Sequence, residues 1–365
     1  HRPMSESLLL GLAAIFVLGA AAQWIAWRLR LPSILLLLLT GVAAGPEAFG
    51  LVDPDTLFGE LLFPIVSLSV GILLFEGGLT LRLPELGEQG RVVFKLVSVG
   101  AGISWLLTTL AARFLLGLSW PLATLLGAIL VVTGPTVILP LLRQIRPTGS
   151  VGPILKWEGI LIDPVGAVLA VLVLEGLIAG GGSATATVVL LGIAKTILIG
   201  GLIGLVAGWA MSRLLGRFLI PDHLHSPAAL AFAVGAFTLS NHVQHESGLL
   251  ATTLMGIYLA NQKRASIRQI VEFKENVRVL IITALFIILA ARLKLAHLAA
   301  LDWRMILFLL ALIVLIRPAT ILCCTAGSSL RRNERIFLAG MAPRGIVAAA
   351  VSTLFALRLG AAGYE

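Results

Sequence analysis

The sequence predicts an all-α, polytopic membrane protein. Hydrophobic residues make up 58% of the 365 residues and charged residues only 12%, about half the charged fraction of a typical soluble domain. The mean hydropathy is +1.03, and apolar stretches of roughly 17–25 residues, long enough to cross a bilayer as helices, recur along the chain. The short alternating segments of a membrane β-barrel are absent from the sequence.

Polar, proline and glycine breaks divide the chain into twelve predicted helices. The first three residues, His1 to Pro3, precede Met4 and are interpreted as a cloning remnant. The predicted helices span residues 8–28, 33–50, 62–81, 91–117, 121–146, 151–178, 186–217, 227–242, 248–262, 272–293, 303–326 and 333–358.

Basic residues are concentrated in the loops that follow the odd-numbered helices. Eighteen lie there, whereas the opposite loops hold four, so the first set is predicted to be cytoplasmic and the N-terminus outside. The net charge of +9 therefore reflects membrane topology, and no nucleic-acid partner is expected. The eighteen are Arg28, Arg30, Arg82, Arg91, Lys95, Arg143, Arg146, Lys156, Arg213, Arg217, Lys263, Arg264, Arg268, Lys274, Arg278, Arg331, Arg332 and Arg335.

Two predicted helices carry helix-breaking residues in apolar surroundings. Gly134 and Pro135 interrupt the fifth helix, and Pro343 and Gly345 interrupt the twelfth. Interrupted helices at matching places in two halves are typical of inverted-repeat transporters, which bind their substrates at these breaks. A simple proline kink is the alternative interpretation of the first break.

The matching breaks predict two inverted six-helix repeats with discontinuous crossing helices, about 12–13 transmembrane helices in all. The repeats are expected over residues 4–179 and 226–365, with a linking helix over 184–218. A counterpart of the sixth helix is missing from the second repeat, so we expect one further helix beyond the sequence shown.

Asp163 is the candidate exchanging carboxylate because it lies in the middle of an apolar helix, directly before Pro164. The helix near Thr133 should unwind, so that free carbonyls and a hydroxyl become ligands for a small cation. Desolvation favours the protonated carboxyl and a nearby cation favours the ionised one, so such a group holds either a proton or a metal ion. A buried structural aspartate is the alternative.

Glu158 lies about 140° around the same helix from Asp163 and can have a partner of its own. Arg317 and Arg344 both fall within apolar runs, where an arginine needs a counter-charge. Either could neutralise Glu158, and we interpret Glu158–Arg317 as an ion pair with a structural role.

The chain resembles the membrane domain of the monovalent cation:proton antiporter superfamily, the sodium/proton and potassium/proton exchangers, over nearly its whole length. The resemblance is carried by "LLFEGGLTL" (73–81), "VVTGPTVILPLL" (131–142), "WEGILIDPVGAV" (157–168), "HESGLLATTLMGIYLAN" (245–261), "IRPAT" (316–320) and "APRGIVAAAVS" (342–352).

The resemblance implies that Asp163 binds the ion and exchanges the proton and that Thr133 supplies oxygens from the unwound crossing. It also implies that Glu158 pairs with Arg317 and that Arg344 lies by the second crossing. No cofactor is implied, and the transported species are H⁺ and Na⁺ or K⁺. A homodimer, a bacterial inner-membrane location, a role in pH homeostasis and a cytosolic nucleotide-binding regulatory domain are further expectations.

Three positions depart from the family pattern and leave fewer side-chain oxygens at the site. The common Thr-Asp-Pro is Thr133-Gly134-Pro135 here. The position before Asp163, Asn in the electroneutral branch and Asp in the electrogenic branch, holds Ile162, and a common Ser is Gly159.

Other polar residues receive simpler interpretations. Glu76 is expected at a cytoplasmic helix end facing Arg82, and Cys323 and Cys324 are expected to be buried small hydrophobes. His242, His245 and Glu246 have a spacing that could bind a metal, but a solvated loop is the favoured interpretation.

The predicted function is therefore secondary antiport, and not enzymatic catalysis. One alternative is a K⁺ channel-like route, which would need a carbonyl-rich filter. Another is a K⁺/H⁺ system that is gated by a cytosolic regulatory domain absent here. A sodium-coupled symporter would need more polar side chains at the midplane. The sequence contains no Walker-type nucleotide loop, so it does not indicate an ATP-driven pump.

Overall fold

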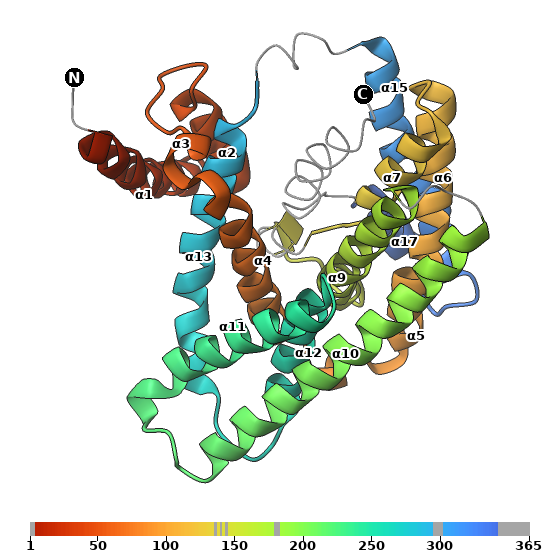
Figure 1. Ribbon diagram of the computed structural model, residues 1–365. Coiled ribbons are helices and arrows are strands. Elements are labelled where there is room, and N and C mark those ends of the chain that lie inside the picture. The colour runs from red at the N-terminus through yellow and green to blue at the C-terminus, as the bar shows by residue number, and fades with distance from the viewer. Residues whose placement is uncertain are drawn as a thin grey trace.

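The computed structural model describes residues 4–134, 137–138, 141–142, 145–178, 183–294 and 302–341. Within these ranges every regular element is helical (Figure 1). In this described part six helices are long and apolar enough to cross a membrane, which confirms the predicted fold class. They cover Leu8–Leu29, Pro54–Gly78, Gly90–Leu115, Val151–Ile178, Leu191–Gly216 and Trp303–Thr325.

One group of helices combines the start of the chain with a segment beyond residue 220 (Figure 1). Helix α2 packs on α13 and α1 packs on both, while α4 packs on α12 and α11. The backbones of α4 and α12 meet at glycines, since a Cβ on Gly256 would lie only 2.3 Å from the Phe75 carbonyl oxygen. The group comprises α1 (Met4–Leu29), α2 (Ser33–Ala44), α3 (Pro54–Phe58), α4 (Leu62–Gly78), α11 (His225–Val243), α12 (Ser247–Asn261) and α13 (Arg268–Ala291).

A second group surrounds α9, the most buried of the six candidate spans. In its most apolar window 78% of α9 is buried, against 22–39% for the others, so α9 is an interior helix. Helix α7 and the turn before α6 pack on it, and α16 packs on that turn. The group comprises α5 (Gly90–Lys95), α6 (Ala101–Leu115), α7 (Trp120–Ile129), α9 (Val151–Ile178), α15 (Trp303–Ala311), α16 (Arg317–Thr325) and α17 (Arg332–Gly340).

Helix α10 (Ser183–Gly216) connects the two groups and runs along α9, α11 and α12 (Figure 1). It approaches α12 closely at a glycine, because a Cβ on Gly204 would lie 2.3 Å from the Ala251 carbonyl oxygen. Its bounds lie close to those of the helix predicted over residues 186–217. Its role as a link between two inverted repeats stays a prediction.

Several helices differ from their predicted bounds. The second ends at Ala44 instead of residue 50, because Gly45 is extended ahead of Pro46. The fourth and eleventh helices each contain a π turn, Leu96–Gly100 and Leu312–Ile316, where continuous α-helix was predicted. The structure describes the twelfth predicted helix only as α17 and Met341. The predicted break at Pro343 and Gly345 therefore lies outside the described residues.

Candidate ion-exchange site

The helix that begins with α7 is interrupted where the sequence predicts. Helix α7 ends at Ile129, and residues 132–134 adopt no regular structure. Helical bonding resumes where the amides of Val137 and Ile138 donate to the Gly134 carbonyl, at 3.3 and 3.2 Å. Thr133 therefore lies in an irregular stretch between two helical segments, while Pro135 lies outside the described residues.

Two glycines of α9 bring this irregular stretch directly against the helix. A Cβ on Gly159 would lie 3.5 Å from the Thr133 carbonyl oxygen, and a Cβ on Gly166 would lie 2.3 Å from Val132 Cγ2. Asp163 comes four residues after the first glycine and three before the second, so it shares their face of the helix. The geometry thus sets Asp163 against the break in the neighbouring helix.

The close approach at Gly166 predicts the effect of a single methyl group. Gly166→Ala should lower the melting temperature, since overpacking typically costs about 1–3 kcal/mol and Val132 must move away. Val132→Ala in the same chain should recover most of the loss, because it removes the methyl that clashes. Thermal unfolding of the two single variants and of the double variant measures these changes. If the stability loss of the double variant equals the sum of the two single losses, the contact is contradicted.

The site contains buried oxygens without hydrogen-bond partners. Asp163 is 1% exposed and Thr133 is 4% exposed. Within the described part of the chain, neither Asp163 Oδ1 nor Thr133 Oγ1 has a partner. Buried polar atoms are nearly always paired, so these two oxygens are free for a ligand. Carboxylate, hydroxyl and carbonyl oxygens suit a small hard cation, and the carboxylate alternatively takes a proton.

The structure brings Glu158 and Arg317 together in a buried ion pair. Arg317 Nη1 donates to Glu158 Oε1, and Nη2 donates to Oε2 at 2.9 Å. The arginine Nε also donates to the Leu338 carbonyl at 3.3 Å. Arg317 therefore connects α9, α16 and α17. Arg344, the other predicted partner of Glu158, lies outside the described residues.

Glu76 lies two residues before the end of α4 at Gly78, as expected, but its expected partner is wrong. Its side chain is buried in α4 and accepts from Arg278 Nη1 of α13 at 3.2 Å, instead of facing Arg82. Arg278 also pairs with Glu275. Arg278 belongs to the basic residues that are predicted to lie in loops, but α13 begins at Arg268, so Arg278 lies almost three turns inside the helix. An acidic residue within an apolar helix is the signal that could have predicted a buried cationic partner.

The remaining candidates make no site in the described residues. No group of three His, Cys, Asp or Glu side chains there could hold a metal ion. Cys324 is buried as expected, but Cys323 is exposed, because adjacent residues on a helix point in different directions.

A buried carboxylate against an interrupted helix, in an all-helical membrane fold, is an arrangement typical of secondary ion transporters. The chain belongs to the sodium/hydrogen exchanger family. The family model described as "Sodium/hydrogen exchanger, transmembrane" matches residues 12–362. This family is the one that the sequence motifs predict.

Curated relatives and solved structures agree with this assignment. "Na(+)/H(+) antiporter 1" of Methanocaldococcus jannaschii is 28% identical, over 96% of this chain and 83% of the relative. "K(+)/H(+) antiporter NhaP" of Alkalimonas amylolytica is 26% identical, over 93% of this chain and 58% of the relative. The structure of the sodium proton antiporter MjNhaP1 from M. jannaschii at pH 8 superposes with a TM-score of 0.81, at 25% identity, over 98% of this chain and 88% of that one.

Proposed function

We propose that this protein exchanges a monovalent cation for a proton across the membrane by alternating access around Asp163. The observation that carries the proposal is the buried Asp163 carboxylate, which has an unpartnered oxygen and faces the broken helix at Thr133. Family membership supports antiport, and similarity to Na⁺/H⁺ and K⁺/H⁺ antiporters supports Na⁺ first and K⁺ second as the cation.

In this mechanism Asp163 carries one ligand at a time. The ionised carboxylate, with the Thr133 hydroxyl and carbonyl oxygens, binds the cation, and protonation removes the charge that holds it. Because the two ligands compete for one carboxylate, the site returns either loaded with the cation or protonated. This competition couples the two fluxes in opposite directions when the empty, ionised site does not switch between the two sides of the membrane.

The other site residues have supporting roles in the proposal. Glu158 and Arg317 neutralise each other and hold α9 against α16, whereas Arg344, Pro343 and Gly345 belong to the second crossing. We further propose a homodimer in a bacterial inner membrane, with the N-terminus outside and a cytosolic regulatory domain as a partner. The excess of basic residues in alternate loops supports this orientation.

Purified protein in liposomes tests the exchange directly. A preset pH gradient should collapse when Na⁺, K⁺ or Li⁺ is added in turn, and the most effective cation identifies the substrate. If no cation changes the gradient, antiport is wrong. If K⁺ moves as a current without any proton flux, antiport is wrong and the channel-like alternative applies.

Exchange is predicted to be electrically silent, with one cation for each proton. Ile162 precedes Asp163, and Glu158 is committed to Arg317, so one carboxylate is left to carry charge. Moving a net charge would couple transport to the membrane potential by about 2.3 kcal/mol per 100 mV. We therefore expect the Na⁺/H⁺ exchange rate to be the same at zero potential and at a potential imposed with K⁺ and valinomycin.

The opposite result has a specific meaning. Acceleration by an imposed potential would require a second titrating group, and Glu158 would be examined first. If the cation scan identifies K⁺ as the substrate, currents measured on a solid-supported membrane replace the valinomycin clamp, and none should be detected.

A further inference from the structure

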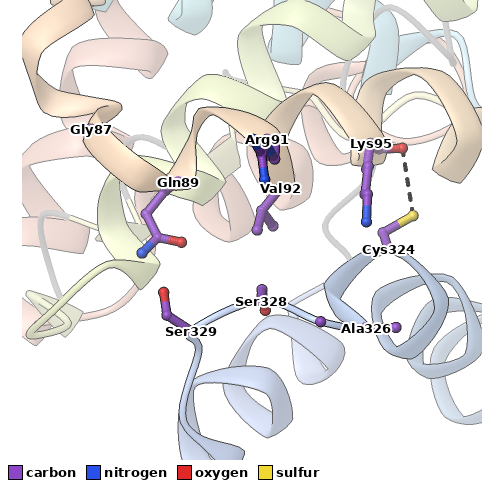
Figure 2. Close-up of a pocket in the computed structure, with 10 residues that line it drawn as sticks. Gly87, Gln89, Arg91, Val92, Lys95, Cys324, Ala326, Ser328 and Ser329 are labelled. Atoms are coloured by element: carbon purple, nitrogen blue, oxygen red, sulfur yellow. Dashed lines mark hydrogen bonds between the residues drawn. The ribbon is translucent and has the colours of Figure 1, made fainter.

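A cavity of about 520 Å³ lies between α5 and the loop that joins α16 to α17 (Figure 2). In Figure 2 the amine of Lys95 lies in the gap, and Gln89 and Ser329 point toward each other across it. The lining includes Gln89, Arg91 and Lys95 on one side and Gly327, Ser328 and Ser329 on the other. The volume is sufficient for a phosphate group and part of what it is attached to.

The cavity presents positive charge without a counter-charge among the described residues. Arg91 and Lys95 are one helical turn apart, and neither has an ion-pair partner among the side chains that the structure describes. By contrast, Lys156 is paired with Glu85. In the described part of the chain no acidic residue lines the cavity. Like charges one turn apart repel each other, so a bound anion would relieve this repulsion.

The loop side of the cavity is fixed in shape. Gly327 has φ +74°, a conformation that favours glycine and allows the chain to turn directly after α16. The Ser328 hydroxyl donates to the Thr325 carbonyl at 2.7 Å, and Arg335 donates to the Ser328 carbonyl at 3.1 Å. Ser329 remains exposed, so its hydroxyl is available to a ligand.

The cavity lies where two of the candidate membrane spans end. The candidate span Gly90–Leu115 starts one residue before Arg91, and the span Trp303–Thr325 ends two residues before Gly327. Both candidate spans therefore end at this cavity, and the ends of membrane-spanning helices are where lipid headgroups are expected. The excess of basic residues in these loops assigns these span ends to the cytoplasmic side.

We propose that this cavity is an anion site that binds a phosphate group, from either an anionic lipid headgroup or free phosphate in solution. Arg91 offers a planar fork of donors, Lys95 a point charge and Ser329 a hydroxyl, the combination that recognises phosphate. The bound group bridges α5 and the α16–α17 loop, so it stabilises the protein. The site is independent of Asp163 and of the proposed exchange.

Thermal unfolding of the purified protein in an uncharged detergent tests the proposal. Sodium phosphate is compared with sodium chloride at equal sodium concentration, with choline chloride added to the chloride sample so that the ionic strengths also match. Short-chain phosphatidylglycerol is compared with short-chain phosphatidylcholine. A ligand at about ten times its Kd should raise the melting temperature by roughly 2–5 °C. The shift should disappear in the Arg91→Gln/Lys95→Gln variant.

Matched variants make the result decisive. Lys263→Gln/Arg264→Gln removes the same charge from exposed residues of another loop and should keep the shift. Ser329→Asp adds a carboxylate to the cavity and should abolish it while both cations remain. A shift with phosphatidylglycerol alone identifies a lipid ligand, and a shift with phosphate alone a soluble one. The proposal is overturned if neither shifts the wild type, if phosphatidylcholine acts equally, or if the cavity variants keep the shift.

Discussion

Asp163→Asn is expected to reduce cation-dependent proton exchange to the rate of protein-free liposomes. The amide has nearly the same shape as the carboxylate, but it carries no charge for the cation and takes up no proton near neutral pH. Asp163 is almost fully buried against the broken helix, and within the described part of the chain its Oδ1 has no partner. The variant should therefore fold and elute as the wild type does while exchange is lost.

Asp222→Asn is the matched control, because it makes the same chemical change on a side chain that is 78% exposed. It should exchange normally. A second measurement separates binding from transport: cation-induced stabilisation of the wild type should weaken as the pH falls, since protons compete with the cation for Asp163. In Asp163→Asn this pH dependence should vanish, and normal exchange by that variant would eliminate the mechanism.

The sequence predicts the helices well because the membrane restricts the choices. Every backbone donor in a lipid-embedded segment must be satisfied within the segment, so long apolar runs have to be helices. The sixth predicted helix, residues 151–178, matches α9 at both ends. The break at Thr133 was also predictable, because glycine and proline act locally on the backbone.

The π turns were not predictable, because the apolar spacing of the sequence carries no signal for them. The Leu96–Gly100 turn lies against α16, where a Cβ on Gly100 would be 3.1 Å from Cys324 Sγ. Nearby, the hydroxyls of Ser104 and Thr320 are 3.1 Å apart. The π turn Leu312–Ile316 directly precedes Arg317. One inserted residue rotates the rest of the helix by about 100°, so regular helical spacing could not give the direction of Arg317.

The residues of the candidate site can be proposed from the sequence, but their packing cannot. Chemistry identified Asp163, since a carboxylate in an apolar helix needs a function or a partner. Only the three-dimensional structure shows that the irregular stretch packs against Gly159 and Gly166, on the helix face that carries Asp163. The Glu76–Arg278 pair was missed because its partners are 202 residues apart and one was assigned to a loop.

Glu158→Gln is expected to destabilise the fold strongly while leaving cation preference unchanged. The bidentate pair with Arg317 is buried, and the arginine also holds the end of α17 through the Leu338 carbonyl. Removing the carboxylate leaves a buried guanidinium without its counter-charge, a change that typically costs about 3–5 kcal/mol. A marked drop in melting temperature measures the loss. Arg317→Gln should produce a similar drop, because it leaves the carboxylate unpaired.

The double variant Glu158→Gln/Arg317→Gln distinguishes a structural pair from an ion ligand. If the two residues serve mainly to neutralise each other, the double variant loses much less stability than the two single losses added together, since no unpaired charge remains. Glu272→Gln is the matched control, because its pair with Arg268 is exposed and should give no measurable change. If Glu158→Gln instead keeps the wild-type melting temperature and loses its response to Na⁺, Glu158 binds the ion. The exchange would then involve two carboxylates, and its electrical silence would no longer be expected.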